Sequence, residues 1–106
     1  MKLENKVAAI TGGSAGIGRA IAEAYLAEGA KVTIMARNAE KANAVLKEIG
    51  AGDRLVFIPG DATDQNDIES FVDKTVETFG SIDVLVNNAG GAGDLQPAVN
   101  LSDEAF

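Results

Sequence analysis

Residues Val7–Gly18, with the sequence VAAITGGSAGIG, decide the fold of this chain. The apolar run Val7–Ile10 does not alternate with polar residues, a pattern typical of a strand that is buried on both faces. A glycine-rich turn follows at once, and a helical pattern begins inside that turn. A strand, a glycine turn and a helix in direct succession indicate an anion site at the start of the helix.

The glycines in the spacing Gly-x-x-x-Gly-x-Gly are expected to have separate tasks. We expect Gly12 to adopt backbone angles that a side chain would forbid, Gly16 to leave room for a phosphate, and Gly18 to let the helix pack closely on the strand. The first N–H groups of the helix lack internal partners, and the helix dipole adds to their pull on a pyrophosphate. A tight turn without a ligand is the alternative interpretation.

Composition narrows the classes of function. The chain has 106 residues, which allow one domain or part of one, and 46% of them are hydrophobic, as in a globular protein. A net charge of −7 argues against nucleic acid or an anionic membrane as a partner, but not against a nucleotide. Without Cys or His, the chain has no disulfide, thiolate zinc site or His-based triad. Because there is neither a signal-peptide core nor a membrane-length apolar run, we expect a cytoplasmic protein.

Strand-like runs alternate with helical patterns along the chain. The sequence predicts strands over residues 6–11, 31–36, 54–58 and 82–86. We expect the first helix to bury Ile17, Ile21, Ala24 and Tyr25 on one face. We expect the second helix to begin at Asn38 and the third at Thr63 or Asp64, because these side chains can cap a helix.

This alternation predicts an α/β fold, a Rossmann-type doubly wound parallel sheet with the strand order 3-2-1-4. Ligands bind such sheets in the crevice at the carboxyl ends of the strands, between the first and the fourth. Val84–Val86 is apolar on both faces, so the fourth strand would be a bare edge if nothing covered it. We therefore expect an incomplete domain that stops within a helix starting near Ser102, or a second chain that covers this edge.

The turn Thr11–Gly18 and the later run Asn87–Gly90, with the sequence NNAG, resemble two motifs of the short-chain dehydrogenase/reductase family. The resemblance extends from about Lys6 to the end of the chain. It implies that residues 1–106 are the N-terminal part of a single NAD(P)-binding domain. It also implies hydride transfer between a nicotinamide cofactor and a small carbonyl or alcohol substrate, and a homo-oligomer for the full-length protein.

The resemblance also implies a set of cofactor-binding residues. They are Thr11, Gly12, Ser14, Gly16, Ile17, Gly18, Arg37, Asp61, Ala62, Asn87, Ala89 and Gly90. The family's catalytic Ser, Tyr and Lys have no match here, because Tyr25 is the only tyrosine and Gly29 stands four residues after it. We therefore expect this chain alone to bind dinucleotide and to catalyse nothing.

The choice of cofactor depends on the end of the second strand. NAD-binding proteins usually carry an acidic residue there, about 20 positions after the turn, which bonds the ribose 2′-hydroxyl. Here Ala36 stands at that place and Arg37 follows, so no carboxylate repels a 2′-phosphate and a guanidinium can pair with it. This predicts NADP(H), with NAD(H) as the alternative, although Ala15 lacks the second basic residue of many such relatives. Arg37 as a solvated surface charge is the other interpretation.

Two further positions have competing interpretations. The resemblance implies that Asp61 accepts a hydrogen bond from the adenine amino group and that the Ala62 backbone adds a contact. The alternative for Asp61 is a loop acid or a helix cap, but Asp64 is better placed for capping and would leave Asp61 free. The resemblance implies that Asn87 ties neighbouring strands together, whereas an Asx turn is the alternative for the Asn-Asn pair.

Three hypotheses about function remain. The first is the cofactor-binding half of an NADP-dependent short-chain oxidoreductase. The second is a stand-alone dinucleotide-binding module without catalysis. The third is a relative of another class, such as an epimerase, which the pairing of the two motifs disfavours.

Overall fold

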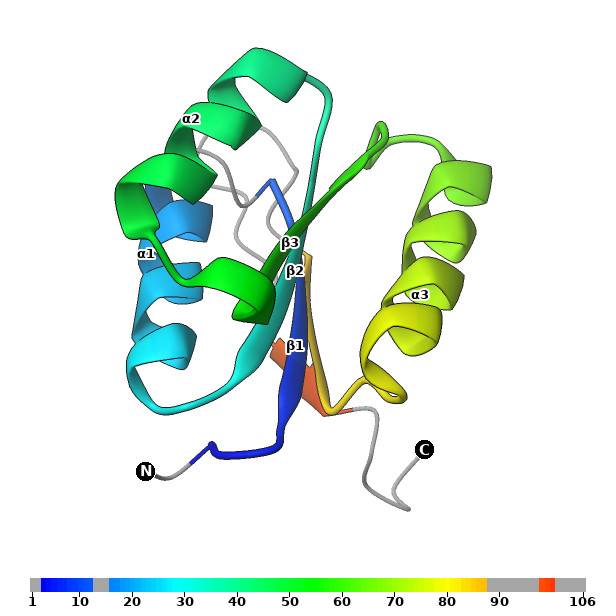
Figure 1. Ribbon diagram of the computed structural model, residues 1–106. Helices are drawn as coiled ribbons and strands as arrows, with labels where there is room; N and C mark the ends of the chain where they lie inside the picture. Colours follow the sequence, from blue (N-terminus) through cyan, green and yellow to red (C-terminus); the bar gives the residue numbers. More distant parts are fainter. Residues whose placement is uncertain (1–2, 13–15, 88–97, 101–106) are drawn as a thin grey trace.

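The computed structural model describes residues 3–12 and 16–87, and the backbone alone of residues 98–100. The strands are β1 (Val7–Thr11), β2 (Lys31–Ala36), β3 (Leu55–Pro59), β4 (Val84–Asn87) and β5 (Ala98–Asn100). The helices are α1 (Gly16–Ala27), α2 (Ala39–Ile49), α3 (Gln65–Phe79) and the short 3-10 helix η1 (Gly52–Arg54). Figure 1 shows the sheet between α1 and α2 on one side and α3 on the other.

The sheet has the order β3-β2-β1-β4-β5. Strands β1 to β4 pair in parallel, which confirms the predicted doubly wound arrangement with the order 3-2-1-4. The fifth strand was not predicted. It pairs antiparallel with β4, with Val84 opposite Asn100, so the expectation that β4 is a bare edge is wrong within this chain. A run of three residues is too short to show the alternation from which a strand is recognised.

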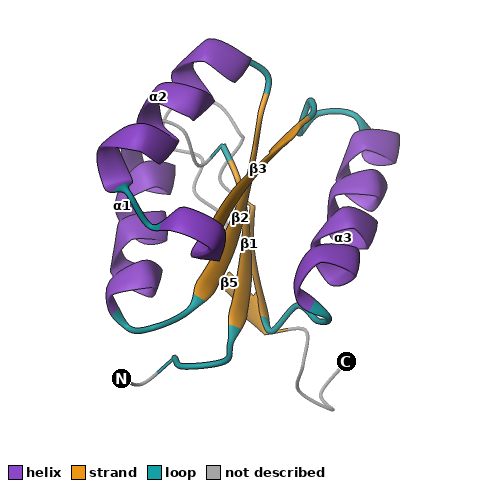
Figure 2. Ribbon diagram, in the orientation of Figure 1, coloured by secondary structure: helices purple, strands orange, loops and turns teal. Residues whose placement is uncertain are grey.

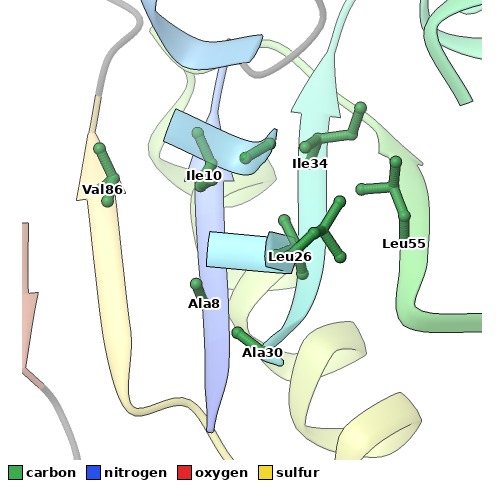
Figure 3. Close-up of a cluster of buried hydrophobic side chains, with 9 residues drawn as sticks. Ala8, Ile10, Leu26, Ala30, Ile34, Leu55 and Val86 are labelled. Carbon is green, nitrogen blue, oxygen red and sulfur yellow. The ribbon is translucent and has the colours of Figure 1, made fainter. Parts of the chain in front are cut away.

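Two hydrophobic clusters lie on opposite faces of the sheet, because successive strand residues point to opposite sides. Ala8 and Ile10 of β1 belong to the cluster beneath α1 and α2, in which Leu26 packs against the sheet (Figure 3). Ala9, between them, belongs to the cluster beneath α3, together with Phe71. The helices in Figure 2 therefore enclose the sheet from both faces, as continuous apolar strands require.

The buried face of α1 differs from the predicted one. Its buried residues are Gly18, Ala22 and Leu26, whereas Ile17 is 54% exposed and Ala24 is also exposed. Ile21 and Tyr25 are partly buried against the same cluster, so Tyr25 packs on the core as predicted. The physical reason is close approach, because Gly18 has no side chain and lets its own face of the helix lie nearest the sheet.

The helix ends are those that the sequence predicts. The Asn38 side chain accepts a hydrogen bond from the Lys41 N–H at 3.0 Å and caps α2, and Gly50 ends this helix in a left-handed conformation. Asp64, rather than Thr63, caps α3 by accepting from the N–H groups of Asn66 and Asp67. These caps fix where the loops that follow β2 and β3 turn into helices.

A buried carboxylate joins β4 to β1 at the edge of the sheet opposite the glycine turn. The Val7 N–H donates to Oδ2 of Asp83 at 2.8 Å, and the Asp83 N–H donates to the Val7 carbonyl at 2.8 Å. Asp83 is buried, so these hydrogen bonds compensate for the solvent that its carboxylate has lost. They fix the position of β4 beside β1 at the amino ends of both strands.

Candidate functional site

The carboxyl ends of β1 and β4 meet at Thr11 and Asn87, which lie opposite each other in the parallel register. The buried Thr11 hydroxyl donates to the Asn87 side-chain oxygen at 2.9 Å, and the Val86 carbonyl lies 3.4 Å from the same hydroxyl. Asn87 thus joins neighbouring strands, while Asn88, Ala89 and Gly90 lie outside the described residues.

The glycine turn leaves β1 at this edge. Gly12 has a φ of 70°, the left-handed conformation that the sequence predicts, and its N–H donates to the Met35 carbonyl at 2.7 Å. Gly16 opens α1 with a φ of 57°, and a Cβ at this position would meet no atom of the described residues within 4 Å. Among the described residues, none fills the space beside Gly16 at the first turn of α1. Ser14 of the predicted phosphate site lies outside the described residues.

A cavity of about 310 Å³ lies beside this turn, beyond the carboxyl ends of β2 and β3. Three stretches of chain line it, namely Gly12 from the turn, the segment after β2 and the segment after β3. Its lining residues are Gly12, Met35, Ala36, Arg37, Asn38, Lys41, Gly60, Asp61, Ala62 and Thr63. The structure thus brings Gly12, Arg37, Asp61 and Ala62 of the predicted set into one cavity.

Arg37 lies at this cavity with its side chain 78% exposed. Its Nη1 is 3.9 Å from Oδ2 of Asp61, whose side chain is 38% exposed. Ala36 ends β2, so no carboxylate stands at the end of this strand. The cavity therefore has a solvent-exposed guanidinium on one side and a carboxylate facing it.

Asp61 is held by its own turn. Its Oδ1 accepts hydrogen bonds from the Thr63 hydroxyl at 2.7 Å and from the Thr63 N–H at 2.9 Å. These two bonds, helped by the charge of Arg37, lower the pKa of Asp61 below its ordinary value. The prediction that Asp64, and not Asp61, caps the helix is confirmed, but Asp61 is only partly free, because Thr63 binds its Oδ1. Only Oδ2 is not engaged by Thr63, and that oxygen lies toward Arg37.

Gly60 is required by close packing beneath Asp61. A Cβ at this position would lie 2.7 Å from Sδ and 3.1 Å from Cγ of the buried Met35. The Asp61 N–H, next in the chain, donates to Oδ2 of Asp67 in the first turn of α3 at 2.8 Å. These contacts hold the segment after β3 against the end of β2.

Sequence reasoning did not identify several lining residues, namely Met35, Asn38, Lys41, Gly60 and Thr63. Asn38 and Thr63 were considered only as helix caps. The one available signal was position, because residues just after parallel strands gather at the same edge of the sheet.

Two other features, a metal-binding group and a membrane-spanning helix, are absent from the described residues. In residues 3–12 and 16–87, no group of His, Cys, Asp and Glu is arranged to hold a metal ion. Within the same ranges, no helix is long and apolar enough to cross a membrane. The polar and charged groups at this edge of the sheet are the backbone N–H groups at the start of α1, the cations of Arg37 and Lys41, and the side chains of Asp61 and Asn87.

Comparison with known proteins identifies the family. A family model described as short chain dehydrogenase matches residues 6–106. The sorbitol dehydrogenase of Cereibacter sphaeroides is 45% identical over 106 residues, which are all of this chain and 40% of that protein. The NADP-dependent (R)-specific alcohol dehydrogenase of Lentilactobacillus kefiri is 44% identical over 89 residues, which are 84% of this chain and 35% of that protein.

A solved structure agrees with the fold. The C-domain of a bacterial malonyl-CoA reductase, determined with NADP, has a TM-score of 0.79 and 36% identity, covering 85% of this chain and 15% of that one. The topology, the glycine turn and the family match all agree. This chain belongs to the short-chain dehydrogenase family of oxidoreductases, and it spans about two fifths of the length of the sorbitol dehydrogenase.

Proposed function

We propose that this chain is the NADP(H)-binding part of a short-chain oxidoreductase that transfers hydride between the cofactor and a carbonyl or alcohol substrate. The observation that carries the proposal is the cavity beside the glycine turn. It has Arg37 on its wall, and Ala36 stands where a carboxylate would repel a 2′-phosphate.

The residues present suit a dinucleotide. The open space at Gly16 lets a diphosphate approach the first N–H groups of α1. Asp61 and Ala62 line the cavity in which the adenine would lie, and Oδ2 of Asp61 is the oxygen that Thr63 leaves available for its amino group. Ile17, exposed at the start of α1, and Asn87, which is bonded to Thr11, also belong to the described part of the binding set. The cofactor, when bound, supplies the hydride.

The phosphorylated cofactor is favoured by charge. A guanidinium pairs with a phosphate through charge-assisted hydrogen bonds, which are about twice as strong as neutral ones. Two relatives support this choice, since one is an NADP-dependent alcohol dehydrogenase and the other a reductase domain determined with NADP. We therefore propose NADP(H) rather than NAD(H) for this chain.

The chemistry of proton transfer is proposed to lie outside residues 1–106. Tyr25, the only tyrosine, packs against the core beneath α1 and so is not available to a substrate. We propose that these residues form the N-terminal part of a larger NAD(P)-binding domain, consistent with their span of 40% of the sorbitol dehydrogenase. The small carbonyl or alcohol substrate and the homo-oligomeric assembly belong to that whole protein.

The proposal is tested by titrating the purified protein with NADPH and NADH and following the fluorescence of the reduced nicotinamide. We expect NADPH to bind at least about ten-fold more tightly, because a charge-assisted phosphate contact contributes on the order of one to three kcal/mol. Arg37→Ala should remove most of this difference by weakening NADPH binding and leaving NADH binding unchanged.

Lys74→Ala is the matched control, because it removes one exposed positive charge from α3 without touching the cavity. It should leave both affinities unchanged. Equal affinities, tighter binding of NADH, or an Arg37→Ala variant that binds NADPH normally would refute the preference. No saturable binding of either nucleotide would refute the proposed function itself.

A further inference from the structure

The charge of Arg37 is not fully available to a ligand, because Asp61 lies opposite it across the cavity. The carboxylate oxygen Oδ2 is 3.9 Å from the guanidinium, and the low pKa of Asp61 keeps this group ionised at neutral pH. A phosphate that approaches Arg37 therefore also meets a negative charge nearby. Arg37 and Asp61 together carry no net positive charge, so a further cation beside them would strengthen the attraction for a phosphate.

Lys41 lies on the wall of the same cavity, in the first turn of α2. Its side chain is exposed, and among the described residues it forms no ion pair with a carboxylate. Its backbone N–H is bound by the Asn38 side chain at 3.0 Å, so the cap holds the start of the helix, and with it Lys41, beside the end of β2. The backbone of Lys41 is thus fixed beside the cavity, and its ammonium group forms no ion pair within the described part of the chain.

We propose that Lys41 is a second binding residue for the 2′-phosphate of the adenosine ribose, acting together with Arg37 and offsetting Asp61. This inference rests on the proposed function, because it places the adenosine half of NADP(H) in the cavity. An ammonium on a flexible stem can reach a phosphate as a point charge, whereas Arg37 supplies the directed fork of donors. Lys41 is then a determinant of selectivity between the two nicotinamide cofactors.

The test uses two nucleotides that differ only at the position in question, adenosine 2′,5′-bisphosphate and 5′-AMP. Their dissociation constants are measured by calorimetry at one fixed, low ionic strength, where exposed charges are least screened. Lys41→Gln should raise the dissociation constant of the bisphosphate by about five- to twenty-fold and that of 5′-AMP by less than about two-fold. Lys41→Arg, which keeps the charge, should restore most of the bisphosphate affinity.

Lys47→Gln is the matched control, since it makes the same change on the same helix, at an exposed residue that does not line the cavity. It should leave both affinities within about two-fold, as a distant exposed charge contributes little. A general effect of net charge would appear equally in both variants and would overturn the inference. So would a Lys41→Gln variant that weakens the two nucleotides equally, or neither.

The failure of the inference and of the proposed function give different results. If unmodified protein binds neither nucleotide, the proposed function fails and the inference fails with it. If it binds both, and Lys41→Gln does not change their ratio, only the inference fails.

Discussion

The hydroxyl of Thr11 donates to the side-chain oxygen of Asn87 at 2.9 Å, and this bond joins β1 to β4 where the two strands end. The Thr11 side chain is buried, and its hydroxyl also lies 3.4 Å from the Val86 carbonyl, so both of these oxygens belong to β4. The bond therefore links the stability of the sheet to the geometry of the ligand crevice.

Removing this bond should destabilise the fold. We expect Thr11→Val, which keeps the shape of the side chain, to lower the free energy of unfolding by about 1–2 kcal/mol in urea denaturation. Asn87→Ala should cost less in the Thr11→Val background than in the unmodified protein, with a coupling energy of about 0.5–1.5 kcal/mol. Strictly additive losses would show that the two side chains do not interact.

A side chain at Gly16 should affect binding more than folding. Gly16→Ala places an alanine at a φ of 57°, which costs about 1 kcal/mol of stability by urea denaturation. The added methyl group also extends into the space beside α1 that the described residues leave open. We therefore expect it to lower the affinity for NADPH by more than about ten-fold.

Gly52→Ala provides the matched control for Gly16→Ala. Gly52 has a φ of 60°, and a Cβ there would also meet no described atom within 4 Å, but this residue begins η1 before β3 and is not part of the first turn of α1. Both variants should lose similar stability, and only Gly16→Ala should lose affinity. Equal affinities in the two variants would remove Gly16 from the binding site.

A methyl group at Gly60 should strain the wall of the cavity. Since its Cβ would stand 2.7 Å from Sδ of the buried Met35, Gly60→Ala should destabilise the protein by about 1–3 kcal/mol in thermal or urea unfolding. In a Met35→Val background, which removes the sulfur atom, the same substitution should cost measurably less. An unchanged cost would show that Met35 is not the obstacle.

The acidity of Asp61 should depend on Thr63. Its hydrogen bonds to the Thr63 hydroxyl and N–H hold the pKa below the ordinary value of 3.8, and Arg37 adds to the shift. A carboxyl group whose pKa is lower in the folded state stabilises the fold at pH values above its unfolded-state pKa. This contribution is lost as the pH falls through the folded-state pKa. The pH dependence therefore lies in the acid range below 3.8.

Carbon-detected NMR of the Asp61 carboxyl group measures this titration directly. The midpoint should lie below 3.8 in the unmodified protein and should rise toward that value in Thr63→Val, which removes the hydroxyl donor. A midpoint that Thr63→Val leaves unchanged would show that the hydroxyl is not the main cause of the shift.

Local signals in the sequence predicted most of the scaffold. The apolar run at β2 gave the observed bounds Lys31–Ala36, and Asn38 and Asp64 cap the helices that follow the strands. The strand order 3-2-1-4 followed from the alternation of strands and helices. These features depend on neighbours in the chain, or on handedness rules that apply to every parallel sheet.

Several of the features that were not predicted depend on contacts between distant segments. The apolar spacing in α1 favoured Ile17 for the core, but the close approach at Gly18 turns a different face to the sheet. Lys41 and Gly60 could not be assigned to the cavity from the sequence. They lie in the segments that follow β2 and β3, and their proximity depends on the directions that these two segments take. The periodicity of apolar residues along the chain does not show which residues of separate segments lie close together.

The two bonded ends of the β1–β4 pair have a consequence for how the crevice can adapt. Asp83 holds Val7 at one end, and Asn87 holds Thr11 at the other. Sliding one strand past its neighbour would break both of these attachments at once, so the two strands cannot change their relative position easily. Loops at the crevice can diverge in sequence without disturbing the frame that carries them, because the frame is held by bonds in and beside the strands.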